Sequence, residues 1–308
     1  APRPELYQLI NDAEELDILA GGKPGKSTGM SNGLAALEAG MVPAEPAEVR
    51  LDESSREKLE SLGYMGAGLS RADDLGNLRD TKDAIGMRKE FIEVIEDYQR
   101  GEIETAEKKL MDLVRRSPES YTFRYKLAKI YYEQGRFPEA KKEFEKLAVM
   151  VPDEYRTHYN LGKTLIKLGE YGRAVDELEA ALELDPTQTP GYNNLGIALL
   201  RSGRVPEAIK AFRRSIELDD RQVDPHNNLG NAYLARGELA RAGEEFRRAV
   251  AINPDFFEGR YNLGLVLLRQ GESRAAAAQF RDAVRIRPGF TGARKQLRRA
   301  LSQTKNNQ

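Results

Sequence analysis

Hydrophobic residues recur at helical spacing in short segments along most of the chain, and these segments stop and restart around regularly placed glycines. Each glycine stands 34 residues after the last, at Gly101, Gly135, Gly169, Gly203, Gly237 and Gly271. The chain must reverse there within a few residues, through a backbone shape that a side chain would disfavour. The pattern therefore predicts an all-α fold of consecutive helix-turn-helix units, with the glycines in the inner turns.

The positions around each glycine repeat as well. When the glycine is numbered position 15, the units begin at Met87, Tyr121, Tyr155, Thr189, Val223 and Phe257. Position 20 is always alanine, at Ala106, Ala140, Ala174, Ala208, Ala242 and Ala276, which suits two closely packed helices. Position 24 is always large and apolar, at Leu110, Phe144, Leu178, Phe212, Phe246 and Phe280. Position 32 is proline in all units but one, and a proline cannot continue a helix.

A Leu-Gly pair occupies positions 7 and 8 of four units, as Leu161-Gly162, Leu195-Gly196, Leu229-Gly230 and Leu263-Gly264. With the alanine, large apolar and proline positions, this pattern resembles the tetratricopeptide repeat family over residues 87–302. The resemblance implies a right-handed α-solenoid with a C-terminal capping helix. We therefore expect an irregular segment and linker over residues 1–86, six repeats over 87–290, and a basic capping helix and tail over 291–308.

The resemblance also implies a binding surface, because the first helices of the units line a concave groove in this family. Position 6 is asparagine in four successive units, at Asn160, Asn194, Asn228 and Asn262. This row resembles the asparagine ladder of protein O-linked sugar transferases, which holds a peptide backbone. A carboxamide both donates and accepts, so it can pair with any peptide bond. The alternative is that these asparagines only bond neighbouring helices.

Aromatic and basic residues surround the row. Position 5 supplies Tyr125, Tyr159 and Tyr261, and position 9 supplies Lys129, Lys163 and Asn231. Such a groove would favour an extended segment with acidic groups, although ordinary solvated helix positions would look the same. The interpretation is a protein-protein interaction scaffold that binds a peptide or partner protein and is not itself an enzyme. No pattern indicates an oligomeric state.

Charge and composition narrow the alternatives. The 48 basic and 49 acidic side chains nearly cancel, so bulk charge favours neither nucleic acid nor an anionic membrane. Basic residues do gather after Gly271, which suits either a capping face or, less well, a nucleic-acid surface. The longest apolar runs are far shorter than the roughly 20 residues of a membrane span. The chain has no cysteine, and its two histidines, His158 and His226, are expected to pack between helices rather than bind a metal.

The first 86 residues carry a second resemblance. Pro4-Glu5-Leu6-Tyr7-Gln8-Leu9 is similar to a segment near the C-terminal end of sulfatase and alkaline-phosphatase-superfamily catalytic domains, and Leu62-Gly63-Tyr64 to the ending of many bacterial sulfatase-like proteins. No Cys/Ser-x-Pro-x-Arg nucleophile motif is present. This resemblance implies the alternative function, an accessory C-terminal region of a sulfatase- or phosphatase-like hydrolase whose catalytic domain lies upstream. It also implies an extracytoplasmic parent, periplasmic or secreted.

No cofactor is expected. Residues 20–27 fit a relaxed phosphate-binding loop, with Lys26 and Ser27 in the phosphate and magnesium positions. A phosphate loop joins a buried strand to a helix, whereas the residues before this segment make a poor strand and Pro24 removes a backbone donor. A flexible glycine-rich loop is the better interpretation. Because the chain begins at Ala1 without a methionine, we expect it to start inside a longer protein.

Overall fold

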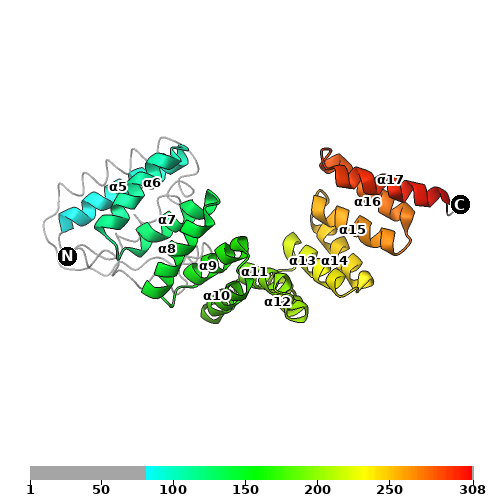
Figure 1. Cartoon of the computed structure of the whole chain (residues 1–308), viewed down its shortest axis with the longest axis horizontal. Coiled ribbons are helices and arrows are strands. Elements are labelled where there is room, and N and C mark those ends of the chain that lie inside the picture. Colours follow the sequence, from blue (N-terminus) through cyan, green and yellow to red (C-terminus); the bar gives the residue numbers. More distant parts are fainter. Residues whose placement is uncertain (1–80, 307–308) are drawn as a thin grey trace, which may run out of the picture. The chain divides into compact units, whose positions relative to one another are not determined.

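The computed structural model describes residues 81–306, and all regular secondary structure among these residues is helical (Figure 1). The all-α fold that the pattern predicts is therefore confirmed. The helices are α5 (Thr81–Gln99), α6 (Ile103–Arg116), α7 (Tyr121–Glu133), α8 (Phe137–Met150), α9 (Tyr155–Leu168), α10 (Tyr171–Leu184), α11 (Thr189–Arg201), α12 (Val205–Leu218), α13 (Val223–Ala235), α14 (Leu239–Ile252), α15 (Phe257–Arg269), α16 (Ser273–Ile286) and α17 (Thr291–Asn306).

The chain divides into two compact units between Ile130 and Tyr131. In the first unit α5 packs against α6, and Val94 and Leu110 are fully buried. The Phe91 ring of α5 lies 5.1 Å from the Phe123 ring of α7, measured between centroids. Helix α5 begins at Thr81, ahead of the first repeat position at Met87, so this helix is longer than the pattern predicts.

The second unit repeats one arrangement. We call α9, α11, α13 and α15 the A helices and α10, α12, α14 and α16 the B helices. Each of α10, α12 and α14 packs against the A helix before it and the A helix after it, and α11 also contacts α9 and α13. Helix α17 packs on α16, and its Ala293 is buried in a cluster with Phe257 and Ala283. None of the helices among the described residues is long and apolar enough to cross a membrane.

The glycines at position 15 form the inner turns, as the sequence predicts. All of them have a positive φ, between 74° at Gly135 and 83° at Gly203 and Gly271. At Gly169 the residue caps α9, and its N–H donates to the carbonyl oxygens of the last helical turn. A side chain would strain this left-handed backbone, which explains why glycine recurs at this position.

A second set of glycines lets the A and B helices approach closely. A Cβ atom added at Gly196 of α11 would lie 2.5 Å from Cε1 of Phe212 in α12. The same contact would be 2.6 Å at Gly230 and 2.7 Å at Gly264, against the rings of Phe246 and Phe280. These rings are completely buried, so position 8 has no room for a side chain in these three units.

We expect Gly196→Ala to lower the free energy of unfolding by about 1–3 kcal/mol, because the new methyl group must displace the buried Phe212 ring. Chemical denaturation followed by circular dichroism measures this loss. Gly172→Ala is the matched control, since its methyl group would meet nothing within 4 Å. The control should be neutral or stabilised by up to about 1 kcal/mol through helix propensity. Equal stability of both variants would contradict the close approach.

Candidate functional site

The asparagines of position 6 link successive A helices through their side chains. In three of them the amide nitrogen donates to the position-5 residue of the preceding repeat, always 35 residues earlier. The bonds join Asn194 Nδ2 to Tyr159 Oη at 3.1 Å, Asn228 Nδ2 to Asn193 Oδ1 at 3.0 Å, and Asn262 Nδ2 to Asn227 Oδ1 at 3.1 Å. We call the residues joined by these bonds the asparagine row. Bonding between neighbouring helices was one of the two roles that the sequence left open.

Three asparagines of the row can still accept hydrogen bonds through their side-chain oxygens. The side-chain oxygens of Asn194, Asn228 and Asn262 accept no hydrogen bond from the part of the chain that the structure describes. All three residues are half-buried, so they are held in place while still reaching solvent. Asn160, the fourth asparagine, donates from Nδ2 to the carbonyl oxygen of Arg156 at 2.8 Å, within its own helix.

Asn193 and Asn227 belong to the row although sequence reasoning did not select them. They stand at position 5, where only the tyrosines had been singled out. They accept the hydrogen bonds of Asn228 and Asn262, just as the Tyr159 hydroxyl accepts the hydrogen bond of Asn194. The signal was available in the sequence as the 35-residue spacing between position 5 of one repeat and position 6 of the next. Asn231 of position 9 also joins the row, because Asn262 Nδ2 lies 3.4 Å from its Oδ1.

Lys163 lies over two tyrosine rings at the α9 end of the row. Its Nζ is 5.0 Å from the Tyr132 ring centroid and 5.2 Å from that of Tyr159, which are cation–π contacts. Tyr159 also stacks on Tyr155 with 5.5 Å between centroids. Burial raises the pKa of Tyr159 and of Tyr132, so both phenols remain neutral at physiological pH.

The remaining predicted residues lie elsewhere. The Tyr261 ring packs 5.8 Å from Phe280 and 5.4 Å from Phe290, both in edge contacts, so it contributes to the packing beneath the end of the array. Tyr125 and Lys129 are on the part of α7 that belongs to the first unit, where Tyr125 stacks on Tyr121 at 5.4 Å. The structure therefore groups Asn194, Asn228 and Asn262 with Tyr159, Asn231 and Lys163.

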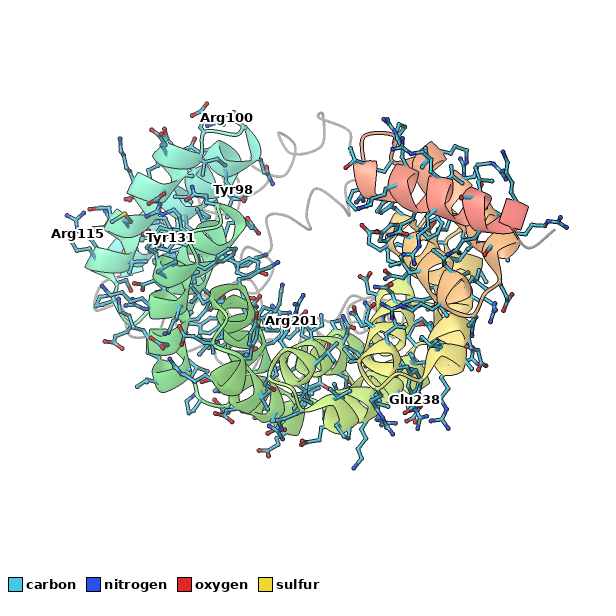
Figure 2. The ribbon with its side chains drawn as sticks, turned by 45° about the vertical axis from the view of Figure 1, so that its right-hand side comes forward. Tyr98, Arg100, Arg115, Tyr131, Arg201 and Glu238 are labelled. Carbon is cyan, nitrogen blue, oxygen red and sulfur yellow. The ribbon has the colours of Figure 1, made fainter. Side chains whose placement is uncertain are left out.

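The A helices are poor in acidic residues. Helices α9 and α11 contain no Asp or Glu, and α13 and α15 contain one each, Asp224 and Glu258, in the first turn. Basic residues occupy later turns of α9, α11 and α15, at Lys163, Lys167, Arg201 and Arg269, whereas α13 has no Lys or Arg. Figure 2 shows Arg201 on the side of the second unit that the A helices line, with Glu238 on the opposite side. Beyond their first turns, α9, α11 and α15 therefore carry basic and no acidic side chains.

The two histidines connect helices at the joints between repeats. His158 Nδ1 lies 2.8 Å from Glu177 Oε2 and its Nε2 lies 2.9 Å from the Pro152 carbonyl oxygen. His226 repeats this geometry, with 2.7 Å to Glu245 Oε2 and 3.1 Å to the Asp220 carbonyl oxygen. Both neighbours of the His158 ring are acceptors, so its doubly protonated imidazolium satisfies both contacts. Among the described residues no group of three metal-binding side chains converges.

Arginine makes the corresponding joint in another repeat. Arg260 Nε donates to the Pro254 carbonyl oxygen at 2.5 Å, and its Nη1 donates to Asp282 Oδ2 at 2.7 Å.

The hydrogen bond to Glu177 raises the pKa of His158, and it outweighs burial, which acts in the opposite direction. The His158 joint is therefore sensitive to pH, whereas guanidinium groups in general stay charged in proteins.

We expect His158→Gln to destabilise the protein by roughly 1–2 kcal/mol at acidic pH, because a charge-assisted hydrogen bond is lost. The folded-state pKa is raised, so this stabilisation is present below the unfolded pKa and is lost as pH rises through the folded value. Denaturation of wild type and variant should show a larger difference at about pH 5.5 than at about pH 8.5. Arg260→Gln is the control, with a loss independent of pH between these values. An equal loss at both pH values for His158→Gln would contradict the charged joint.

The helix pairs and their connecting joints define an α-helical repeat protein, and comparisons with known families agree. One family model described as "TPR repeat" matches residues 230–271. Models described as "Tetratricopeptide repeat" match residues 93–155, 125–189, 159–225 and 257–290. Together the matches extend over more than half of the chain, and it belongs to the tetratricopeptide repeat family. Proteins of this family are protein-interaction scaffolds.

Solved structures with the same fold come from several proteins. MamA from Desulfovibrio magneticus RS-1, from residue 41 to its end, gives a TM-score of 0.53 at 21% identity, over 55% of this chain and 96% of that one. PilF of Pseudomonas aeruginosa gives 0.57 at 18% identity, over 68% and 95%. One chain of the APC/C hetero-tetramer Cut9-Hcn1 gives 0.58 at 18% identity, over 70% of this chain and 43% of that one. These likenesses establish the fold alone. A search of curated proteins found no match.

Proposed function

We propose that this chain is an interaction scaffold whose A-helix surface binds an extended, acidic segment of a partner protein. The observation that carries the proposal is the asparagine row, in which consecutive A helices present Asn194, Asn228 and Asn262 with their side-chain oxygens still able to accept. An extended segment offers backbone N–H groups along its whole length. A row of acceptors can bind such a segment whatever its side chains are.

Two further features support this proposal. The amides of the row are already fixed by hydrogen bonds between helices, so little rotamer entropy remains to be lost on binding. The basic residues Lys163, Lys167, Arg201 and Arg269 would form charge-assisted hydrogen bonds with acidic side chains of the partner. With no acidic residue on the A helices beyond the first turn, an acidic segment would meet little repulsion.

A second candidate role follows from the sulfatase-like motifs at residues 4–9 and 62–64, which lie outside the described residues. In this role the repeats would be an accessory region of an extracytoplasmic hydrolase and would position its substrate or a partner. The two roles are compatible, since an accessory region can act by binding. Metal-dependent hydrolysis of a sulfate or phosphate ester by this chain alone would contradict the assignment as a non-enzymatic scaffold.

We expect the double variant Asn194→Ala/Asn228→Ala to bind its ligand about tenfold or more weakly, through the loss of two hydrogen-bonding groups. Peptides selected by the wild-type protein from a random displayed library serve as ligands, and fluorescence anisotropy gives the dissociation constant. Lys142→Ala/Lys210→Ala, on exposed positions of α8 and α12, is the control and should leave the affinity unchanged.

Thermal unfolding shows whether the asparagine variant remains folded. The double variant also removes amides that bond neighbouring helices, so its effect on binding includes a change within the protein. Arg201→Glu, at an exposed position, is a second variant without this complication. It should selectively weaken the binding of acidic peptides. Wild-type affinity in a folded asparagine variant would remove the row from the binding surface, and wild-type affinity in Arg201→Glu would remove the preference for acidic segments.

A further inference from the structure

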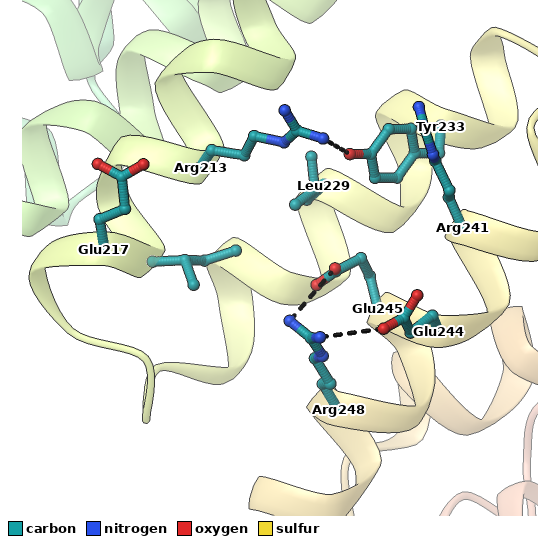
Figure 3. A pocket seen from close by; sticks show the side chains of 9 residues that line it. Arg213, Glu217, Leu229, Tyr233, Arg241, Glu244, Glu245 and Arg248 are labelled. Carbon is teal, nitrogen blue, oxygen red and sulfur yellow. Dashed lines mark hydrogen bonds and ion pairs between the residues drawn. The ribbon is translucent and has the colours of Figure 1, made fainter.

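A cavity of about 320 Å³ opens on the B-helix side of the second unit (Figure 3). Helices α12 and α14 provide its charged side chains, and Ile216 of α12 with Leu229 and Tyr233 of α13 form its apolar part. It is lined by residues of three neighbouring helices and contains three arginines and three glutamates. The asparagine row does not contribute to it, so the cavity is separate from the proposed peptide surface.

Tyr233 is the central group of the cavity. Its side chain is only 3% exposed, and its hydroxyl oxygen accepts a hydrogen bond of 2.7 Å from Arg213 Nη2. The guanidinium carbon of Arg213 lies 6.0 Å from the ring centroid and that of Arg241 lies 5.7 Å from it. The phenol can still donate its own hydrogen, and no acceptor for it is present in the described part of the chain.

The carboxylates of the cavity already have partners. Glu244 accepts from Arg248 at 3.0 Å, and Glu245 lies 3.7 Å from Arg248 Nη1 and 2.7 Å from His226 Nδ1. Glu217 accepts from Arg214 of its own helix at 3.1 Å.

Arg213 differs from the other two arginines of the cavity, Arg241 and Arg248, because it pairs with no carboxylate among residues 81–306. Figure 3 shows its side chain extended toward Tyr233, with Glu217 on the other side. Arg241 has a carboxylate partner outside the cavity, Glu238, at 2.8 Å.

We propose that this cavity binds an oxyanion, a carboxylate or a phosphate, between Arg213 and Tyr233. The anion accepts from the remaining N–H groups of Arg213 and from the Tyr233 hydroxyl, whose hydrogen then has an acceptor. Arg241, on the opposite wall of the cavity, adds positive charge beside the same ring. The planar guanidinium fork suits both carboxylate and phosphate, and such hydrogen bonds are stronger in a recessed site than on an open surface.

Titration of the whole 308-residue chain carrying ¹³C-labelled tyrosine tests the site. Sodium phosphate and sodium acetate are the two probes, each compared with sodium chloride at equal ionic strength. Tyr233→Phe identifies the Tyr233 ring signal by its disappearance. We expect that signal to shift saturably with at least one probe. Arg213→Gln should weaken binding about tenfold, since a charge-assisted bond contributes more than a neutral one. Arg247→Gln, an exposed position of α14 outside the cavity, should not change it.

Saturation by phosphate alone, by acetate alone or by both supports the site and identifies the anion that it takes. The proposal is overturned if neither probe gives a saturable shift, or if Arg213→Gln binds as tightly as the wild type. Asn194→Ala/Asn228→Ala should bind the anions normally. A negative result at this cavity therefore leaves the proposed peptide surface untouched, and the reverse also holds.

Discussion

The close contact between position 8 of an A helix and position 24 of its B helix is the constraint on which the array depends. Glycine at position 8 leaves room for a ring that lies directly on the A-helix backbone, as Phe212 does at Gly196. This contact fixes how each pair crosses and hence where the next A helix can pack. Because the contact recurs from Gly196 to Gly264, successive A helices are held in one register, and a side chain at a given position meets a predictable neighbour.

The asparagine row is a consequence of that register. Residues 35 positions apart face each other across neighbouring A helices, so each amide finds an acceptor on the preceding helix. The acceptor changes from the Tyr159 hydroxyl to the amide oxygens of Asn193 and Asn227, while the geometry of the bond is kept. A tyrosine and an asparagine are therefore interchangeable here as acceptors, although they differ in size and in the surface they present to a ligand.

Features repeated within every unit could be predicted from the sequence, because each repeat supplies an independent instance of the same packing. The positive φ at Gly169 and the buried ring of Phe212 are examples. Features made between units could be predicted only in part. The pattern selects Asn194 and contains its 35-residue spacing from Tyr159, but it does not contain the distance between A helices that lets the two side chains bond. The contact of Arg213 with Tyr233 depends in addition on one rotamer among many and left no periodic signal.

The joints at position 4 show that a regular scaffold need not be uniformly stable. Arg260 holds the preceding loop carbonyl and a B-helix carboxylate through a guanidinium, whereas His158 makes both of its contacts only as imidazolium. Deprotonation therefore removes one donor from the His158 joint. In repeat arrays each unit is stabilised mainly by its neighbours, so this weakening acts on the repeat of α9 and on the helices packed against it. Tyr159, which accepts the hydrogen bond of Asn194, follows His158 directly on the same helix.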